Sequence, residues 1–504
     1  MPDEIELKLA LPESEQRRFL RHGLLKQALS RETVQLVNIY YDTPDLALHK
    51  RGIAMRLRRQ GRLWLQTIKC AGVSAAGLSR RPEWETPYRG QFDFSAISDE
   101  PLRKWLMRPK ICGRVGPVFE TSFRRTTWRF EPEPGRAILL MLDRGWISAA
   151  GKRERISEVE IELVAGEVAS LFQLAQSLSA TLPLTPAMRS KAERGYRLFG
   201  AIEETPVKAR NIPLQANMAP VMAFQRIALS CLEHLQTNHH GAVSGGDPEY
   251  IHQMRVATRR LRAAMRLFRA VLPPGFSEEL LPSLRELMLP LGQTRDLDVL
   301  LTEIVAPVMS ALPTEPRLAA LAGHVTERHH AARAAAAQIL QAPEYGRLML
   351  LATRMLNQPI FTSTNESINT PLTRFATSRL KQQRRKVLRL ATESRSNDPA
   401  SLHALRIGIK RLRYALEFFS PLMAEKNLRA IVRHLVNLQD SLGQLNDLAN
   451  AGDLLMQCAA DIPHLREAVS LIGGWHGPRH KDLLTTAAKA ITQLRHIPLP
   501  PLSK

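Results

Sequence analysis

The chain has 504 residues, with 70 lysines and arginines against 48 aspartates and glutamates, and a net charge of +22 at pH 7. A single core stops growing at roughly 250–300 residues, so we expect more than one domain. The charge excludes an acidic binding protein and points to an anionic partner: nucleic acid, a membrane surface or a phosphate compound. Both parts of the chain are basic, with 33 basic and 25 acidic residues up to residue 205, then 37 and 23.

The cysteines and the hydropathy of the chain indicate the cellular compartment in which the protein is expected. The chain is charged from Asp3 onward and lacks the apolar segment of a signal peptide. No apolar run reaches the length of a membrane span. We therefore expect a soluble, cytoplasmic protein without a membrane partner. The cysteines are far apart and form neither a disulfide framework nor a zinc pattern: Cys70, Cys112, Cys231 and Cys458.

The first 200 residues alternate between short strand-like segments and Gly/Pro turns. Helices are expected near residues 13–29 and 166–181, the second from its apolar stripe. Many strands with charge on one face favour an α+β fold in which an antiparallel sheet curls into a barrel with a polar interior. The expected strands are residues 3–10, 34–41, 53–59, 62–69, 82–88, 118–130, 137–143 and 156–164.

The N-terminal segment places acids and a base on one face of a strand. Side chains alternate along a strand, so Glu4, Glu6 and Lys8 point one way and the apolar residues between them point the other. The pattern returns at residues 158–163, which read Glu-Val-Glu-Ile-Glu-Leu. A face with several like charges needs a counter-charge, which solvent, a basic partner or a metal ion can supply.

These charged faces suit a metal ion and a phosphate compound. Carboxylates are the ligands that Mg²⁺ or Mn²⁺ prefers, and the candidates are Glu4, Glu6, Glu160 and Glu162. Cations on other strands would face them: Lys8, Arg56, Arg58, Lys69, Arg125 and Lys191. Opposed acidic and basic walls are organised for phosphoryl transfer. No P-loop sequence is present, which excludes a Walker-type nucleotidase. The alternative is an open sheet with a solvated charged face.

After a proline-punctuated linker at residues 204–219, the chain is expected to be helical over 220–497. Breaks are expected near Pro273-Pro274-Gly275, Pro313, Pro343, Pro359, Pro399, Pro421 and Pro463. This part contains an internal repeat at an offset of 151, because two separate blocks match: residues 252–262 with 403–413, and 291–297 with 442–448. We therefore expect an all-α domain of two duplicated helical bundles, related by a pseudo-twofold axis.

Each copy of the repeat carries a stripe of cations at helical spacing. The first stripe is His252, Arg255, Arg259 and Arg262, and the second is His403, Arg406, Lys410 and Arg413. Basic residues at this spacing repel one another unless an anion bridges them, and arginine matches phosphate oxygens bidentately. Two such helices facing each other would line a groove for a linear polyanion. A solvated basic face is the alternative.

Two further interpretations of the helical part fit less well. The stripes lack the interleaved aromatics of single-strand binding, and no DNA- or RNA-reading motif is present, so no nucleic-acid partner is expected. A di-iron bundle would use Glu-x-x-His pairs such as Glu249/His252 and Glu327/His330. The repeat places Ala400 where the first copy has Glu249, so it keeps the cations and drops the ligand.

The N-terminal motifs, taken together, resemble the CYTH superfamily of triphosphate tunnel metalloenzymes. The Glu4-x-Glu6-x-Lys8 signature is followed, in family order over residues 1–200, by Tyr40-Tyr41-Asp42-Thr43, Arg56-Leu57-Arg58, Lys69, Arg81-Pro82-Glu83, Arg125-x-x-Trp128, Leu142-Asp143, residues 158–162 and residues 190–196. The repeat blocks resemble a CHAD domain, a helical module associated with polyphosphate, over about 220–495. The layout is similar to bacterial CYTH–CHAD inorganic triphosphatases, with domains expected at 1–203 and 220–497.

The resemblance implies an eight-stranded antiparallel tunnel and a role for each matching residue. Metal ligands would be Glu4, Glu6, Glu160 and Glu162, with Asp143 joining the metal or orienting a lysine. Substrate phosphates would be held by Arg56, Arg58, Lys69, Arg81, Arg125 and Lys191. Catalytic roles would fall to Lys8, Glu4, Glu6 and Lys69, with Lys8 or a nearby carboxylate positioning or deprotonating water. The cofactor would be Mg²⁺, or alternatively Mn²⁺.

The implied activity is hydrolysis of inorganic triphosphate to diphosphate and phosphate, with the CHAD domain binding polyphosphate through the two cationic stripes. Association with polyphosphate granules is a further expectation. The same tunnel could instead serve an adenylate cyclase or a thiamine triphosphatase. A third possibility is a polyphosphate-binding protein without catalysis, and the intact set of acidic residues argues against it.

Overall fold

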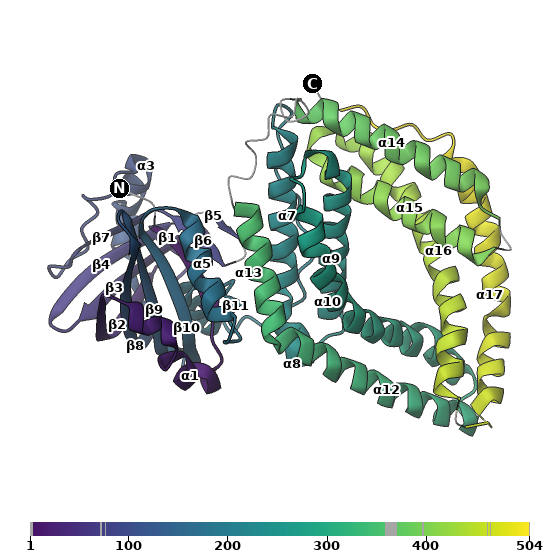
Figure 1. Ribbon diagram of the computed structural model, residues 1–504, viewed down its shortest axis with the longest axis horizontal. Coiled ribbons are helices and arrows are strands. Elements are labelled where there is room, and N and C mark those ends of the chain that lie inside the picture. Colours follow the sequence, from purple (N-terminus) through teal and green to yellow (C-terminus); the bar gives the residue numbers. More distant parts are fainter. Residues whose placement is uncertain are drawn as a thin grey trace. The chain divides into compact units, whose positions relative to one another are not determined.

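A computed structural model describes residues 4–70, 73–75, 77–357, 370–395, 398–460, 462–463 and 465–502. The chain forms two compact units (Figure 1). The first comprises Met1–Thr205 and Gln341–Gln358, and the second comprises Pro206–Leu340 and Pro359–Lys504. The helix at residues 343–357 therefore belongs to the first unit, although the chain enters the second unit long before it. The unit boundaries are not those of a simple division near residue 204.

The first unit is built on one antiparallel sheet in which the order of strands is β5-β6-β1-β10-β9-β8-β2-β3-β4-β7, with β11 also paired to β1. Only Pro82 separates β6, near one end of this order, from β7 at the other end. The sheet must therefore curl until its two ends meet, which makes a tunnel-like half-barrel. The strands are β1 (Glu4–Ala10), β2 (Ser30–Asp42), β3 (Ile53–Gln60), β4 (Leu63–Cys70), β5 (Val73–Ala75), β6 (Leu78–Arg81), β7 (Glu83–Pro87), β8 (Gly116–Glu133), β9 (Arg136–Ala149), β10 (Lys152–Ala165) and β11 (Thr185–Pro186).

The α+β fold and the curled antiparallel sheet expected from the sequence are confirmed. All eight expected segments are strands, but the described residues form eleven strands in total. The additional strands β5, β6 and β11 have four residues or fewer. Segments this short carry no readable alternation of polar and apolar residues. Their place is set by neighbouring strands, because β6 and β11 pair with β1 and β5 pairs with β6.

Helices cover the outer, apolar face of the sheet. Leu7 and Leu9 of β1 lie in a buried core with Leu171 and Phe172 of α5, which leaves the alternate residues of β1 to face the interior. The helices of this unit are α1 (Gln16–Leu20), α2 (Ala47–Lys50), α3 (Glu100–Leu106), α4 (Pro109–Cys112), α5 (Val168–Ser179), α6 (Lys191–Phe199) and α13 (Pro343–Asn357).

The helix expected over residues 13–29 is wrong. Only α1 is α-helical there, flanked by 3₁₀ turns at Glu13–Glu15 and Gly23–Gln27. His22 has an extended backbone, and its Nδ1 accepts a hydrogen bond from the amide of Leu24 at 3.3 Å. This local bond replaces the helical pattern, so the apolar spacing continues while the helix does not.

Apart from an isolated β-bridge between Met423 and Leu502, the described residues of the second unit form helices joined by turns and coil. Its helices are α7 (Pro220–Thr237), α8 (His239–Ser244), α9 (Glu249–Leu267), α10 (Phe276–Val299), α11 (Ala306–Ala311), α12 (Pro316–Gln341), α14 (Leu372–Glu393), α15 (Pro399–Phe418), α16 (Glu425–Cys458) and α17 (Leu465–Leu494). A π-helical turn, Leu300–Val305, joins α10 to α11. The expected breaks fall between helices, except that the one at Pro359 lies outside the described residues. Within those residues we find no helix with the length and hydropathy to cross a bilayer.

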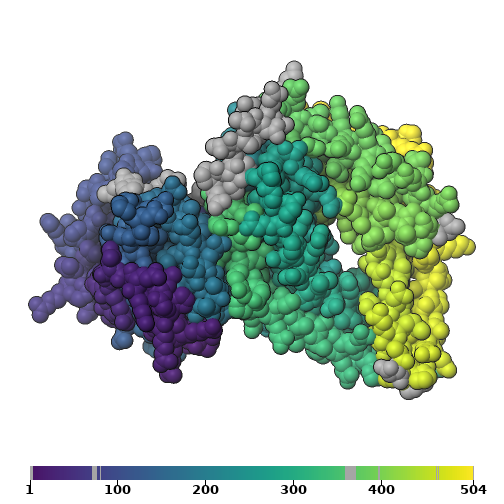
Figure 2. Space-filling model, viewed as in Figure 1, coloured from purple at the N-terminus to yellow at the C-terminus, as the bar shows by residue number. Residues whose placement is uncertain are grey.

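The two copies of the sequence repeat fall on matching helices. The first block lies on α9 and α15, and the second lies on α10 and α16. α9 and α15 contact each other, so the helices that carry the two cationic stripes lie side by side. Figure 2 shows the surface of this unit hollowed between the teal-to-green residues of the first copy and the green-to-yellow residues of the second.

Candidate active site

The tunnel encloses a cavity of about 640 Å³ lined by charged side chains from strands all around the sheet. Its acidic residues are Glu4, Glu6, Glu83, Glu85, Glu160, Glu162 and Glu193, and its basic residues are Lys8, His49, Arg56, Arg58, Lys69, Arg81, Arg125 and Lys191. The structure therefore brings together every tunnel residue predicted from the sequence except Asp143, which lies directly behind the wall and is fully buried.

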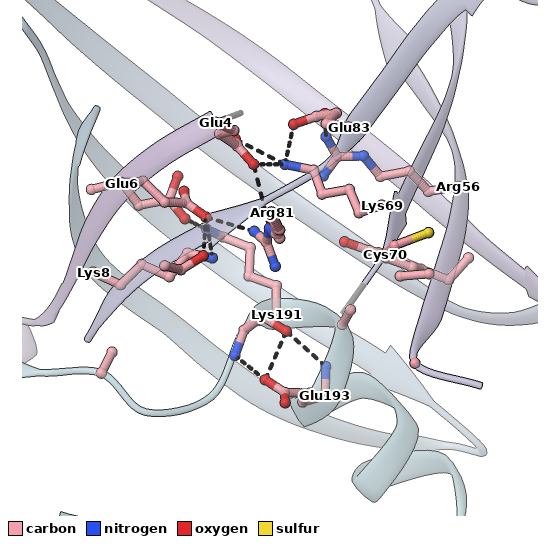
Figure 3. A pocket seen from close by; sticks show the side chains of 18 of the residues that line it. Glu4, Glu6, Lys8, Arg56, Lys69, Cys70, Arg81, Glu83, Lys191 and Glu193 are labelled. Atoms are coloured by element: carbon pink, nitrogen blue, oxygen red, sulfur yellow. Dashed lines mark hydrogen bonds and ion pairs between the residues drawn. The ribbon is translucent and has the colours of Figure 1, made fainter. Parts of the chain in front are cut away.

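Glu4 and Glu6 are each held by cations from neighbouring strands (Figure 3). The amine of Lys69 lies 2.8 Å from Glu4 and 2.6 Å from Glu83, so it bridges β1 and β7. Arg81 reaches both acids of β1, at 3.3 Å from Glu4 and 2.6 Å from Glu6. Lys8 lies 2.8 Å from Glu6. All of these cations line the cavity, so an anion inside it could contact them in place of the carboxylates.

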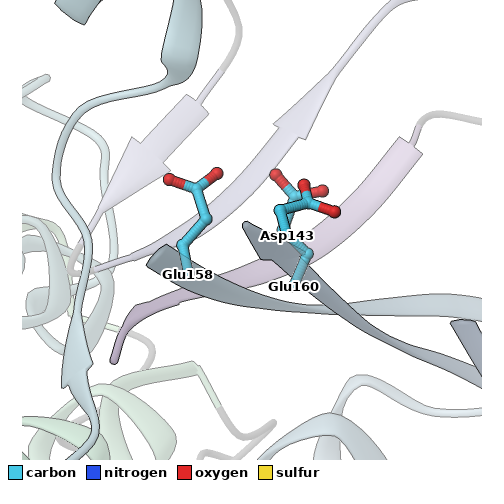
Figure 4. Close-up of side chains that lie close together, drawn as sticks. All are labelled: Asp143, Glu158 and Glu160. Atoms are coloured by element: carbon cyan, nitrogen blue, oxygen red, sulfur yellow. The ribbon is translucent and has the colours of Figure 1, made fainter. Parts of the chain in front are cut away.

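Three carboxylates form a second cluster, and one of them, Glu160, also lines the cavity (Figure 4). Asp143, Glu158 and Glu160 are buried, and their oxygens lie within 4.8 Å of one another. The amine of Lys191 contacts all three, at 2.6 Å from Asp143 and 3.0 Å from Glu160. Arg125 donates to Asp143 through two nitrogens, at 2.8 and 2.6 Å, and also to Glu160.

The carboxylates of this second cluster are paired with cations of the chain itself. Burial acts to raise the pKa of Glu160, but Lys191 and Arg125 hold that pKa well below its ordinary value. Burial likewise acts to lower the pKa of Lys191, and Asp143 and Glu158 raise it above its ordinary value. The cluster is internally compensated, which supports the alternative in which Asp143 orients a lysine.

Glu162 is the acidic residue whose surroundings call for a cation. Burial, followed by the carboxylates of Glu4 and Glu6, raises its pKa to about 7. Glu162 pairs in register with Glu6 across β1 and β10, so the two side chains share the inner face. A divalent cation bound among Glu4, Glu6 and Glu162 would relieve this repulsion, and carboxylate oxygens suit Mg²⁺ or Mn²⁺. The residues present therefore fit the metal that the resemblance implies.

Arg58 lies in the opposite situation, among an excess of positive charge. Burial, followed by the neighbouring Arg56 and Arg125, lowers its pKa to about 10. Its Nε donates to the side-chain oxygen of Asn38 at 3.0 Å, and Glu85 lies 3.7 Å away. An anion would relieve this concentration of guanidinium groups. The cavity thus offers both an acidic group that needs a cation and basic groups that need an anion.

Several residues of the site are absent from the predicted set, including Glu83, Glu158 and Tyr40. Glu158 shares the inner face of β10 with Glu160 and pairs with Lys191 and Arg194, and its period-two spacing was the signal that could have found it. Tyr40 is buried and lines the cavity. Burial acts to raise the pKa of Tyr40, but Arg56 lowers it. No sequence pattern separates this inward tyrosine from a core tyrosine.

In the helical unit, the two repeats place arginines in the same way. A Cβ atom on Gly292 would lie 2.7 Å from the guanidinium of Arg255, and the equivalent distance from Gly443 to Arg406 is 3.6 Å. The glycines of the second repeat block therefore leave room for the arginines of the first. Each arginine also faces an aspartate one turn further on: Asp296 at 3.7 Å and Asp447 at 3.8 Å.

The two stripes meet through part of their length. Burial, followed by Arg406 and then Arg259, lowers the pKa of Lys410 to about 7, and burial and Arg295 lower that of His252 to about 4. The far ends differ. Arg413 pairs with Glu417 at 2.9 Å, and His403 is hydrogen-bonded to Asn446. Burial and the charges of Arg266 and Arg285 lower the pKa of Arg262. Neither of these two arginines is among the residues predicted to bind polyphosphate.

Comparison with known proteins identifies both parts of the chain. The CYTH domain family matches residues 2–196, and the CHAD domain family matches residues 226–456. The chain therefore carries a CYTH domain, the class of protein that the curled charged sheet defines, followed by a CHAD domain.

Two relatives make this more specific. An inorganic triphosphatase from Haemophilus influenzae is 31% identical over 209 residues, which are 39% of this chain and 55% of the relative. The chain thus matches about half the length of this curated relative. The crystal structure of the CHAD domain from the plant Ricinus communis is similar at 35% identity, with a TM-score of 0.51, over 60% of this chain and all of the plant domain.

Proposed function

We propose that the chain hydrolyses inorganic triphosphate to diphosphate and phosphate in the CYTH tunnel, with a divalent cation. The observation that carries the proposal is the cavity of about 640 Å³, which gathers the carboxylates of Glu4, Glu6 and Glu162 with basic side chains that include Arg58. In it, burial and like charges raise the pKa of Glu162 to about 7 and lower that of Arg58 to about 10. A cation and a polyanion that enter together would satisfy both. The similarity to an inorganic triphosphatase supports the same substrate class.

In this proposal, Glu4, Glu6, Glu160 and Glu162 hold the cation, and Arg56, Arg58, Lys69, Arg81, Arg125 and Lys191 hold the phosphates. A divalent cation held there would supply charge neutralisation for the phosphate groups. Lys69 leaves Glu4 and Glu83 to contact a terminal phosphate, and Lys8 with Glu6 orients the attacking water. The water oxygen bonds to the terminal phosphorus, the bridging P–O bond breaks, and one water proton is released. Asp143 keeps Lys191 and Arg125 aimed at the cavity.

The CHAD domain, in the same proposal, binds polyphosphate through the neighbouring stripes of α9 and α15. The contributing residues would be His252, Arg255, Arg259, Arg262, His403, Arg406, Lys410 and Arg413. The support is the contact between α9 and α15, together with the lowered pKa of Lys410 and of Arg406, for which burial is the largest cause and the charge of Arg259 is a further one. Cations gathered in this way gain most from a polyanion. A cytoplasmic location at polyphosphate granules would follow from such binding.

The test is phosphate release from tripolyphosphate, ATP and long-chain polyphosphate, with Mg²⁺ and with a chelator. We expect rapid, metal-dependent turnover of tripolyphosphate that falls by roughly a hundred-fold or more in Glu4→Gln/Glu6→Gln. The exposed variant Glu100→Gln is the matched control. Cyclic AMP formed from ATP would establish a cyclase instead, and polyphosphate binding without turnover would place the protein among the non-catalytic binders.

A further inference from the structure

Helix α13 joins the tunnel unit through a backbone contact that leaves room only for glycine. α13 packs against α5 and β11 (Figure 1), and its Leu350 lies in the same buried core as Leu171 and Leu184. A Cβ atom on Gly346 would lie 1.9 Å from the carbonyl oxygen of Leu184 and 2.9 Å from its carbonyl carbon. Because the obstacle is backbone, no side-chain rotation can relieve it, and a larger residue would displace either α13 or the chain entering β11.

The segment held by α13 supports the strand that carries Lys8. Pro186 of β11 pairs with Leu9 of β1, and the amide of Ala187 donates to the carbonyl of Lys8 at 2.8 Å. The amide of Lys8 in turn donates to Gly77, at 2.9 Å. Gly77 is also packed tightly, since a Cβ atom there would lie 2.8 Å from that of Pro186. Both backbone polar groups of Lys8 are therefore bonded to segments that meet at Pro186.

The same segment leads directly into the cavity wall. Ala187 and Met188 line the cavity, and Lys191 follows at the start of α6. Lys191 is buried and contacts the three clustered carboxylates. A shift at Leu184 would therefore reach the cavity by two routes, through the hydrogen bond to Lys8 and along the chain to Lys191.

The position of α13 in the sequence makes this support non-local. Residues 343–357 lie inside the segment that matches the CHAD family, yet they belong to the compact unit of the tunnel. We propose that α13 is a positioning element of the tunnel, and that Gly346 permits the close contact with Leu184 that keeps Lys8 and Lys191 in working geometry. This proposal rests on the proposed triphosphatase function for its kinetic readout, and on the backbone contacts alone for its structural one.

The test compares two glycine-to-alanine variants of the full-length protein. Gly346→Ala forces α13 away from Leu184, whereas Gly323→Ala adds the same methyl group to α12, where nothing lies within 4 Å. Well below the melting temperature, kcat for tripolyphosphate should fall by roughly ten- to a hundred-fold in Gly346→Ala, with KM changing less. Hydrogen exchange at the amides of Lys8 and Ala187 should become faster. Gly323→Ala should match the wild type in both.

A second pair of variants covers the case in which Gly346→Ala does not fold. Leu350→Ala removes packing without inserting an atom, and hydrogen exchange at Ala187 should again become faster. Leu350→Met keeps nearly the same volume and should behave like the wild type. Equal exchange and equal kinetics in Gly346→Ala and Gly323→Ala would overturn the proposal, as would a drop in stability with unchanged kcat. If the wild type turns over no tripolyphosphate, the proposed function fails, and the exchange measurement still decides whether α13 holds β11.

Discussion

Glu6 and Glu162 lie opposite each other across β1 and β10 and share the inner face of the tunnel. Their surroundings differ, because Glu6 is bound by Lys8 and Arg81, whereas burial and three neighbouring carboxylates raise the pKa of Glu162 to about 7. The negative charge of the two carboxylates is therefore only partly balanced by neighbouring cations. This asymmetry leads to a measurable dependence of stability on pH and metal.

Replacing Glu162 by glutamine should remove a pH-dependent cost of folding. The carboxyl has a pKa near 4.5 in the unfolded chain and about 7 in the folded one. As pH rises from about 4.5 to about 7, the unfolded state ionises first, so the free energy of unfolding of the metal-free wild type should fall relative to Glu162→Gln. The difference should reach on the order of 3 kcal/mol. Urea unfolding across this pH range measures it, and curves that stay parallel would contradict the assignment.

Divalent metal should reverse that cost in the wild type. A cation bound beside ionised Glu162 stabilises the folded state in proportion to the logarithm of its concentration. We expect added Mg²⁺ to raise the melting temperature of the wild type above pH 7, with a much smaller effect in Glu162→Gln. The exposed substitution Glu133→Gln serves as the control. An identical rise in all three proteins would place the cation elsewhere.

Removing Lys191 should destabilise the protein strongly, since Asp143, Glu158 and Glu160 would then share only the guanidinium groups around them. Breaking a buried ion pair typically costs about 3–5 kcal/mol, which we expect for Lys191→Met in urea unfolding at neutral pH. The matched variant Lys104→Met breaks only an exposed pair with Glu100 and should cost less than about 1 kcal/mol. Equal costs would show that the buried cluster is not held by Lys191.

Polyphosphate binding should weaken as pH rises above 7. Burial and neighbouring arginines lower the pKa of Lys410 to about 7, and a bound polyanion would raise it again by stabilising the ammonium group. Binding then takes up a proton, so affinity should fall by up to about tenfold per pH unit above pH 7. Fluorescence anisotropy at constant ionic strength measures the affinity. Lys410→Arg should bind with little pH dependence, because arginine stays charged. If that variant keeps the same pH dependence as the wild type, Lys410 does not have this role.

The salt dependence of binding tests the two stripes together. Replacing four cations of α9 and α15 should weaken polyphosphate binding and make the slope of log affinity against log salt shallower, by roughly one for each phosphate group that the protein no longer neutralises. The variant combines Arg255→Gln, Arg259→Gln, Arg406→Gln and Lys410→Gln. A control with the same change in net charge replaces exposed cations elsewhere: Lys381, Arg385, Lys386 and Lys426. Equal slopes in both variants would remove the groove hypothesis.

The sequence predicted the long strands well because their charges alternate with apolar residues over several positions. Glu4 and Glu6 could be assigned to the inner face from spacing alone, and the cavity lining agrees. Spacing could not distinguish acids that are already compensated from acids that are not. That difference arises in the folded unit, where neighbouring elements decide which charges meet. There, Asp143 and Glu160 contact Lys191, whereas the pKa of Glu162 is raised.

Elements held mainly by tertiary contacts escaped prediction. The strand β11 has two residues, and its pairing depends on β1. Helix α13 was expected as a helix of the C-terminal domain, but no feature of residues 343–357 signals a place in the first unit. Gly346 looks like an unfavourable residue inside a helix until the carbonyl of Leu184 is seen beside it.

The sheet topology also constrains the order in which a growing chain can fold. β1 is synthesised before β10, with which it pairs although the residues of β10 follow about 150 positions later, and α13 is synthesised only after α7 to α12. Pairings this distant in sequence form slowly. The strand that carries Glu4 and Glu6 can pair with β6 early, whereas its pairing with β10 comes only after that later strand is made. The outer layer of the tunnel unit is completed by α13 only after much of the helical unit has emerged.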